Sequence, residues 1–485
     1  MTTNVTINSL ATGVPGLDDV LGGGLPELSF NLIAGQPGCG KTTLAHQIMF
    51  AMATPERPAL YLTALAEPPL KMLRHQQQFE FFDVTMINRS VRFINLTDEA
   101  LADDLDQLLA RIAAEVEAHA PAFVFIDSFR SMVLASTAGN KIQKFLQNLA
   151  ALMTGWQATT FLIGEYLNET DAGPNPVFTV ADGLIWLRQS VERNSVVRKI
   201  EILKMRAQPM LPGLHSFRIS ASGIQVFAPA CAATVGVSAG LSKELPDVRL
   251  RMGVPLLDEM LGGGLPSGYS LLVAGPSGSG KSILAASFLE EGARCGETGV
   301  IAAFEQHPKR SRKRAIADLI KSGRIGLVGT SALDLSIDEI LLLLLNEIRR
   351  LKASRVVIDS LSGFELTLAP TFRGDFRESM LRLVTTLTDE GVTVLMTSEL
   401  EDRYTDLRFS PYGTAFLTDA IIVQRYVELD SRLQRVIAVV KVRGSPHSNE
   451  LRQFIVDDNG IQIGAMLSDQ EGLLIGRPTK KRDAD

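Results

Sequence analysis

The segment GVPGLDDVLGGGLP, residues 13–26, returns almost unchanged as GVPLLDEMLGGGLP, residues 253–266. Eleven of these fourteen positions are identical, at an offset of 240 residues. Three further pairs of blocks follow in the same order in both halves: GQPGCGKT (35–42) with GPSGSGKS (275–282), FVFIDS (123–128) with RVVIDS (355–360), and KMRAQP (204–209) with KVRGSP (441–446). Four ordered matches indicate a tandem duplication, and a unit this long is a whole domain rather than a solenoid repeat.

The duplication also predicts the domain boundaries. A chain of 485 residues fits two to four domains at roughly 100–200 residues each. We expect a first domain at residues 1–230, a linker at 231–247, a second domain at 248–468 and a flexible tail at 469–485. The linker region is rich in small residues and has no clear hydrophobic period.

Each copy alternates short apolar strands with helices. The elements expected in the first copy are strands at 29–34, 59–63, 123–126 and 159–163, and helices at 43–53 and 101–118. This alternation predicts an α/β fold with a mainly parallel sheet that is covered on both faces. Ligands of such sheets bind at the carboxyl ends of the strands.

A glycine loop of the form G-x-x-x-x-G-K-[ST] stands between an expected strand and an expected helix in both copies, which is the P-loop pattern. Its backbone N–H groups and the helix N-terminus favour phosphate, so we expect ATP as the ligand. The residues expected to bind it in the first copy are Gly35, Gln36, Pro37, Gly38, Cys39, Gly40, Lys41 and Thr42. Those expected in the second copy are Gly275, Pro276, Ser277, Gly278, Ser279, Gly280, Lys281 and Ser282. Lys41 and Lys281 would reach the β- and γ-phosphates.

An aspartate ends the next buried strand in the order expected of a Walker B residue: Asp127 in the first copy and Asp359 in the second. With the hydroxyls of Thr42 and Ser282, these carboxylates are the expected Mg²⁺ ligands. The alternative is that each aspartate only caps a helix.

Hydrolysis also needs a carboxylate that orients or deprotonates water. Glu305 follows the expected strand 300–304 and is the candidate in the second copy; otherwise it is a surface glutamate. In the first copy the constant offset places Leu65 at that position, so the candidate is Glu67, two residues later. The alternative for Glu67 is a cap on the helix that follows Pro68 and Pro69.

Two cations recur late in each copy: Lys204 with Arg206, and Lys441 with Arg443. Alternate residues of a strand share one face, so each pair could contact a γ-phosphate together. Because the pairs lie far along the chain from the P-loops, we expect them to reach the nucleotide of a neighbouring subunit, as an arginine finger does in trans. The alternative is a solvated strand face.

The composition limits the partners. The net charge is −6, with 48 Lys and Arg against 54 Asp and Glu, so general attraction to nucleic acid or anionic membrane is not indicated. The three cysteines (Cys39, Cys231 and Cys295) fit no metal motif and no disulfide framework. There is no signal-peptide pattern, and the most apolar stretch, 340–345, is far below the roughly 20 residues that span a bilayer. We expect a cytoplasmic protein without a membrane partner.

Taken together, these blocks resemble the KaiC family of double-domain RecA-like ATPases, and the likeness extends over about residues 6–465. The resemblance implies a homohexameric double ring with ATP between subunits and a KaiB-like regulatory protein partner. It implies hydrolysis mainly in the first ring and serine/threonine autokinase activity in the second. It also implies that Glu305 is the catalytic glutamate of the second domain, and that Lys441, Arg443 and His447 contact the nucleotide of the adjacent subunit.

Three departures from the family pattern bear on function. The paired phosphate acceptors of the clock protein are replaced by Ala415 and Phe416, with Thr414 and Thr418 beside them. The glutamate of the first copy is displaced to Glu67, and the C-terminal tail is short. We therefore expect a relative outside a full oscillator, acting in signal or stress regulation.

Three classes of function are compatible with the sequence. The first is a regulatory ATPase, with possible kinase activity, that switches partner binding with its nucleotide state. The second is a RecA-type recombinase or ring helicase, which would need a basic DNA-contacting loop or module that the sequence does not show. The third is a scaffold that binds ATP without hydrolysing it, against which the intact Lys41, Lys281, Asp127, Asp359 and Glu305 argue.

Overall fold

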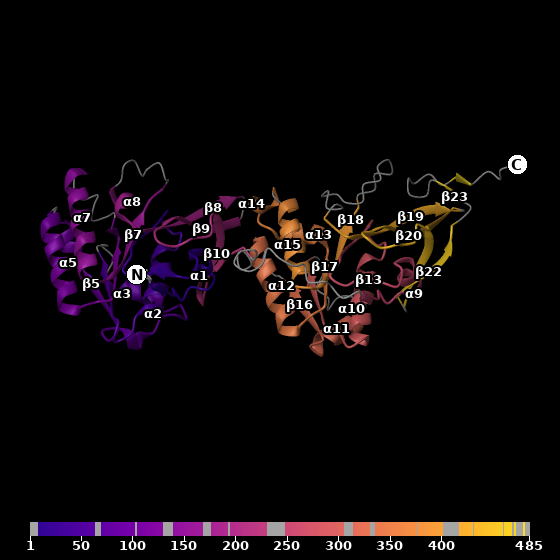
Figure 1. Ribbon diagram of the computed structural model, residues 1–485, viewed down its shortest axis with the longest axis horizontal. Helices are drawn as coiled ribbons and strands as arrows, with labels where there is room; N and C mark the ends of the chain where they lie inside the picture. Colours follow the sequence, from indigo (N-terminus) through magenta and orange to yellow (C-terminus); the bar gives the residue numbers. More distant parts are fainter. Residues whose placement is uncertain are drawn as a thin grey trace, which may run out of the picture. The chain divides into compact units, whose positions relative to one another are not determined.

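The computed structural model forms two compact units, Met1–Ala233 and Thr234–Asp485, each described here by itself (Figure 1). The residues that the structure describes are 8–63, 69–101, 104–129, 139–167, 176–192, 195–229, 248–304, 314–329, 335–374, 376–400, 417–429, 431–458, 460–467, 470–471 and 479–480.

The first unit is built on a nine-stranded sheet of order β11-β10-β9-β8-β3-β7-β6-β4-β5. Its strands are β3 (Phe30–Gly35), β4 (Ala59–Thr63), β5 (Val91–Asn95), β6 (Phe123–Asp127), β7 (Thr159–Glu165), β8 (Gly183–Glu192), β9 (Ser195–Met205), β10 (Leu214–Ser220) and β11 (Gly223–Phe227). From β8 to β5 neighbouring strands are parallel, whereas β9, β10 and β11 continue the sheet antiparallel. A separate pair joins β1 (Ser9–Leu10) to β2 (Leu25–Pro26).

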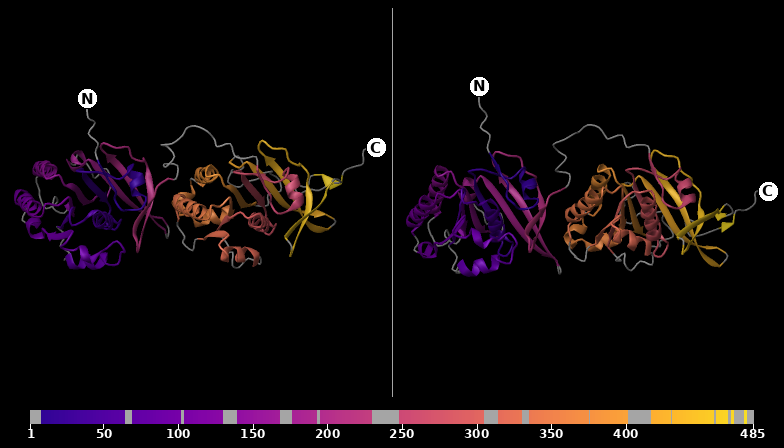
Figure 2. Two further views of the ribbon diagram at one scale, coloured as in Figure 1. Left: turned by 60° about the horizontal axis from the view of Figure 1, so that its bottom comes forward. Right: turned by 90° about the horizontal axis from the view of Figure 1, so that it is seen from below.

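Helices cover both faces of this sheet, as the views in Figure 2 show. One core joins a sheet face to α1 (Leu17–Leu21) and α2 (Lys41–Met52). The other core joins the opposite face to α5 (Leu105–His119), α7 (Gly139–Gly155) and α8 (Pro176–Val180). The remaining short elements are α3 (Pro69–Gln76), the 3-10 helix η1 (Val84–Met86) and α4 (Thr97–Leu101).

The second unit repeats this layout strand for strand, in the order β16-β15-β17-β18-β14-β19-β20-β21-β22. Its strands are β14 (Ser270–Gly275), β15 (Gly299–Ala303), β16 (Ile325–Gly329), β17 (Arg355–Asp359), β18 (Thr393–Glu399), β19 (Ala420–Leu429), β20 (Arg432–Val442), β21 (Arg452–Asp457) and β22 (Gly460–Met466), with a separate pair of β12 (Arg249–Leu250) and β13 (Leu265–Pro266). Its helices are α9 (Pro255–Met260), α10 (Lys281–Arg294), α11 (Arg314–Lys321), α12 (Ile337–Leu351), α13 (Leu361–Thr367), α14 (Pro370–Arg373) and α15 (Phe376–Asp389).

The predicted α/β fold with two mainly parallel sheets is confirmed, with shifts at some element ends. The helix expected at 101–118 is α5, which begins only at Leu105. The Asp104 carboxylate accepts hydrogen bonds from the N–H groups of Asp106 and Gln107, so it caps the helix there and ends the preceding segment. Within the predicted flexible tail, β23 (Gln470–Glu471) pairs with β24 (Thr479–Lys480).

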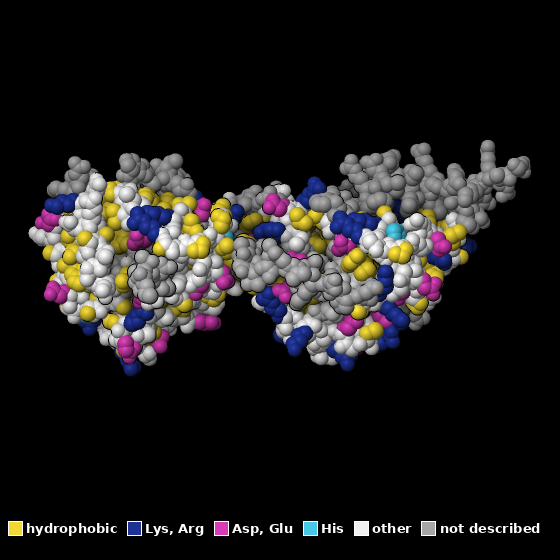
Figure 3. All heavy atoms as spheres, in the orientation of Figure 1, with side chains coloured by type: hydrophobic (Ala, Val, Ile, Leu, Met, Phe, Trp, Pro, Cys, Tyr) yellow, Lys and Arg dark blue, Asp and Glu magenta, His cyan; other side chains and the backbone are white. Residues whose placement is uncertain are grey.

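The burial of the most apolar stretch and the distribution of surface charge bear on the predictions about membrane and nucleic-acid partners. The apolar stretch 340–345 lies in α12 and packs four of its side chains into the unit. No helix in the described ranges is long and apolar enough to cross a membrane. On the face drawn in Figure 3, basic and acidic side chains of the described residues are interspersed over both units.

Candidate nucleotide sites

The P-loop of each unit begins at the carboxyl end of a central strand, β3 or β14, and runs directly into α2 or α10. Its geometry requires glycine in the first unit. Gly35 has φ +149°, and a Cβ there would lie 2.2 Å from the carbonyl oxygen of Leu187. Gly40 has φ +106° directly before α2, a conformation that residues with a Cβ rarely adopt.

The P-loop lysines fold back over their own loops. The Lys41 ammonium donates to the carbonyl oxygen of Gln36 at 2.8 Å, and only 7% of the residue is exposed. The Lys281 ammonium donates to the carbonyls of Gly275 at 2.9 Å and Pro276 at 2.8 Å. Both cations are therefore held at the loop, where a phosphate oxygen could replace the carbonyls as their partner.

A hydroxyl from each P-loop helix meets the aspartate on the neighbouring strand. Thr42 Oγ1 donates to Asp127 Oδ2 at 2.9 Å, and Ser282 Oγ donates to Asp359 Oδ1 at 3.2 Å. Hydroxyl and carboxylate oxygens are ligands that suit Mg²⁺. These pairs therefore fit a cation that takes its remaining ligands from phosphate and water.

The first of these sites opens into a pocket of about 280 Å³ beside the loop. Its walls include Gly38, Lys41, Asp127 and Glu165. Burial raises the pKa of the Asp127 carboxyl, while hydrogen bonds from Tyr61 and Thr42 and the Lys41 charge oppose that rise.

Glu165 is a pocket residue that the sequence analysis missed. It ends β7 and pairs in register with Gly35, and its charge adds to the raised pKa of Asp127. Glu399 holds the equivalent place at the end of β18, in register with Gly275. The sequence did contain a signal for these two residues, because a glutamate closely follows an apolar strand at the same place in both copies.

The two predicted water-orienting carboxylates, Glu67 and Glu305, lie outside the described residues, as do Thr414, Ala415 and Phe416. The strands before the two glutamates are described: β4 ends at Thr63 and β15 at Ala303. Their proposed roles therefore rest on the sequence.

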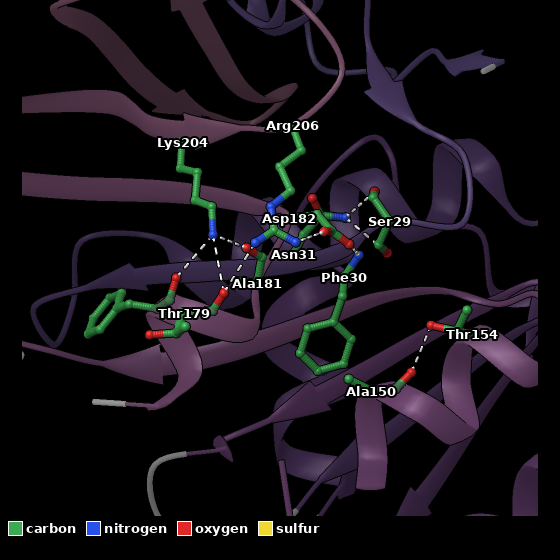
Figure 4. A network of polar contacts seen from close by, with 11 residues as sticks. Ser29, Phe30, Asn31, Ala150, Thr154, Thr179, Ala181, Asp182, Lys204 and Arg206 are labelled. Carbon is green, nitrogen blue, oxygen red and sulfur yellow. Dashed lines mark hydrogen bonds and ion pairs between the residues drawn. The ribbon is translucent and has the colours of Figure 1, made fainter. Parts of the chain in front are cut away.

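The first cation pair lies at the far end of its sheet from the P-loop. Lys204 on β9 pairs in register with Leu184, which pairs with Leu32 near the amino end of β3. Figure 4 shows the Lys204 ammonium directed at carbonyl oxygens at the end of α8. It donates to the carbonyls of Thr179 at 3.4 Å and Ala181 at 2.5 Å.

Arg206 sits beside Lys204 and forms an ion pair with Asp182 at 3.0 Å (Figure 4). Asp182 in turn accepts a hydrogen bond from the N–H of Phe30 at 3.0 Å, which ties the cluster to the start of β3. The pKa of Lys204 is lowered by partial burial and by the charge of Arg206. Two neighbouring cations with one carboxylate between them leave an excess of positive charge, which favours an anion.

The second unit repeats this cluster. Lys441 donates to the carbonyl of Thr418 at 2.6 Å, and Arg443 lies 3.5 Å from the Asp419 carboxylate. Asp419 accepts hydrogen bonds from the N–H and hydroxyl of Ser270 at the start of β14. Burial and the charge of Arg443 lower the pKa of Lys441.

His447, the remaining predicted nucleotide contact, follows this cluster along the chain. Its Nδ1 lies 3.5 Å from the carbonyl oxygen of Ser445. Ser445 also accepts a hydrogen bond from Arg249. His447 therefore belongs to the loop after β20, near the amino end of the sheet rather than near its own P-loop.

Comparison with known proteins identifies relatives over nearly the whole chain. The family model described as "ATPase: KaiC" matches residues 10–230 and 250–468, one match in each unit. The chain is 27% identical over 498 residues to the circadian clock oscillator protein KaiC of Prochlorococcus marinus strain MIT 9313, covering 99% of this chain and 97% of that protein. It is also 27% identical over 492 residues to the protein of the same name from Thermostichus vulcanus, covering 98% and 92%.

Proposed function

This chain belongs to the KaiC ATPase family, as its sequence motifs predicted, and we propose that it binds MgATP at both P-loops and hydrolyses it within a homohexameric ring. The nucleotide state of the ring would then control the binding of regulatory protein partners, with a KaiB-like protein as the expected class. Such a protein acts in signal transduction, or in clock or stress regulation.

One duplicated observation carries this proposal: in both units a P-loop hydroxyl is hydrogen-bonded to the Walker B aspartate. Neither contact is needed for the sheet itself, because the backbone of β6 and β17 already pairs with strands on both sides. A scaffold that binds no nucleotide would not need a hydroxyl–aspartate pair next to a glycine loop and its lysine in both units. A metal–nucleotide site requires the loop, the lysine, the hydroxyl and the aspartate together.

Each residue has a distinct task in this proposal. Lys41 and Lys281 would hold the β- and γ-phosphates, and the hydroxyl–aspartate pairs would hold the cation. Mg²⁺, when bound, would offset negative charge on the phosphates. Glu67 and Glu305 would orient the attacking water. Glu165 lines the pocket beside the first P-loop, and Glu399 is in register with Gly275 at the start of the second P-loop.

The position of the cation clusters supports assembly in a ring. Lys204 and Arg206 lie near the amino end of β3, whereas the P-loop follows its carboxyl end. The cations are thus too far from their own phosphates to touch them. In a ring of identical subunits the same surface can meet the P-loop of the next copy. We propose that each nucleotide lies at such a junction.

The experiment is to follow assembly by light scattering with ATP and Mg²⁺, with ADP, and without nucleotide. We expect a hexamer with MgATP and release of phosphate over time. A monomer that has bound MgATP would contradict the trans arrangement. Tight binding without phosphate release would favour a scaffold, and salt-sensitive DNA binding would favour a recombinase.

Autokinase activity at the second site is the finer part of the proposal. Ala415 and Phe416 carry no hydroxyl, so a two-site phosphorylation cycle at these positions is chemically impossible. Thr418 is fully buried beside Asp419, which argues against it as an acceptor. If a single site exists, the sequence ranks Thr414 first, Thr418 second and Ser410 third, and the burial of Thr418 moves Ser410 ahead of it.

A further inference from the structure

The two nucleotide sites hold their Walker B aspartates with hydroxyls from different strands. In the first unit Tyr61 Oη on β4 donates to Asp127 Oδ2 at 2.7 Å. In the second unit Thr397 Oγ1 on β18 donates to Asp359 Oδ1. In each case this donor shares its acceptor oxygen with the P-loop hydroxyl of Thr42 or Ser282.

Strand register shows that the donors have changed places between the units. Tyr61 pairs with Phe125, and its equivalent on β15 is Ile301, which pairs with Val357. Thr397 pairs with Val273 on β14, and its equivalent on β7 is Ile163, which pairs with Ile33. Each unit therefore has one hydroxyl and one isoleucine at these two positions, in opposite order.

The packing of the first unit accounts for the direction of Tyr61. Its ring lies in a row across the sheet with Phe93 at 5.3 Å and Phe125 at 6.1 Å between ring centroids. His46 from α2 packs against it at 4.6 Å. Tyr61 is fully buried, and no part of this row needs the hydroxyl for packing.

We propose that Tyr61 in the first domain and Thr397 in the second are positioning residues that hold the metal-binding aspartate in place when the P-loop hydroxyl turns to the cation. Asp127 is 3% exposed, so water cannot easily supply a replacement donor. Among the residues that the structure describes, two side chains donate to its Oδ2; Thr42 is a proposed metal ligand, which leaves Tyr61 of these two. The inference rests on the proposed nucleotide function.

The test measures binding rather than turnover. The full chain with Lys281→Ala, which leaves the first site alone, is titrated with ADP by calorimetry in Mg²⁺ and in EDTA. The ratio of the two Kd values reports how much the cation contributes. We expect Tyr61→Phe to reduce this ratio about tenfold, the effect of losing one hydrogen bond to a charged group, with the Kd in EDTA unchanged.

Moving the second domain's donor into the first domain supplies the rescue. Tyr61→Phe combined with Ile163→Thr should restore the Mg²⁺-dependent gain in affinity, because the threonine stands where Thr397 stands on β18. Thr397→Val, in a Lys41→Ala chain, should reduce the ratio at the second site by a similar factor. A thermal melt of each variant checks that it is folded.

The possible outcomes separate this inference from the proposed function. If the Lys281→Ala parent binds no ADP even in Mg²⁺, the nucleotide site itself is wrong. If the parent binds but the ratio is unchanged in Tyr61→Phe, the positioning role is wrong. An equal loss of affinity in EDTA, or no restoration by Ile163→Thr, also overturns it, since either result means that the hydroxyl does not act through the cation site.

Discussion

Two variants that are each unable to hydrolyse ATP at the first site should restore one another when mixed in one ring. Asp127→Asn removes the metal-binding charge but keeps an oxygen that can accept the hydrogen bonds of Tyr61 and Thr42. Arg206→Ala removes the cation at the other end of the sheet. With Asp359→Asn in both chains to silence the second site, we expect each variant alone to be slower by about 10³-fold.

The length of β3 and the random mixing of subunits together set the size of the recovery. At about 3.3 Å per residue, Phe30 and Gly35 lie roughly 17 Å apart, beyond the reach of an arginine side chain. Each site then takes its P-loop from one subunit and its arginine from the next. In an equal, random mixture about one site in four has both groups intact, so about a quarter of the parent rate should return.

The assay is phosphate release at constant total protein, with a tag on one variant to verify by co-purification that the rings are mixed. Unfolding of the Arg206→Ala variant is not expected to account for its slow phosphate release. The Arg206–Asp182 pair is 57% and 32% exposed, so its removal should cost only about 0–1 kcal/mol of stability. Mixed rings that release phosphate no faster than the average of the two variants would refute action in trans.

Three further outcomes follow. Lys41→Ala and Lys281→Ala should each remove one bound nucleotide per chain, measured as ADP stoichiometry, and an unchanged stoichiometry in the double variant would refute both P-loop assignments. Phosphopeptide mapping of residues 408–425 after incubation with MgATP should show no phosphate on buried Thr418 and at most one modified residue; two stoichiometric sites would contradict this. Burial lowers the pKa of His46 from 6.5 to about 4. Its neutral form therefore contributes about 3 kcal/mol to the free energy of unfolding above pH 6.5, and this contribution is lost as the pH falls toward 4. In denaturant titrations at several pH values, His46→Leu should lose less stability between pH 6.5 and 4 than the parent does. An equal loss of stability in both proteins would contradict the role of His46.

The sequence predicted the parts of each site that neighbour one another along the chain. The P-loop, its lysine and its hydroxyl occupy eight consecutive residues, so their relation is local. Asp127 and Asp359 could be added because each ends an apolar strand in both copies. The recurring cation pairs were found because duplication repeats them at almost constant spacing.

What sequence could not supply depends on which strands are neighbours. Tyr61 and Asp127 are 66 residues apart along the chain. They come into contact only because β4 pairs with β6 in the sheet. Comparing the two copies did not reveal this contact either. In the second copy Ile301 stands at the position of Tyr61, and Thr397 stands at the position of Ile163. Asp182 was missed because its partner Arg206 lies 24 residues later, across the β8–β9 pair, although the same spacing separates Asp419 from Arg443 in the second copy.

The exchange of hydroxyl donors limits the order in which substitutions can accumulate after a duplication. A copy with Tyr61 and Ile163 that lost its tyrosine first would pass through a form whose aspartate has neither of these two donors and whose cation site is about tenfold weaker. Gaining the threonine first avoids this weakened form and passes through an ancestor with both hydroxyls. A relative that carries both hydroxyls in one domain would be such an intermediate, whereas a lineage with neither should gain less affinity from Mg²⁺ at that site.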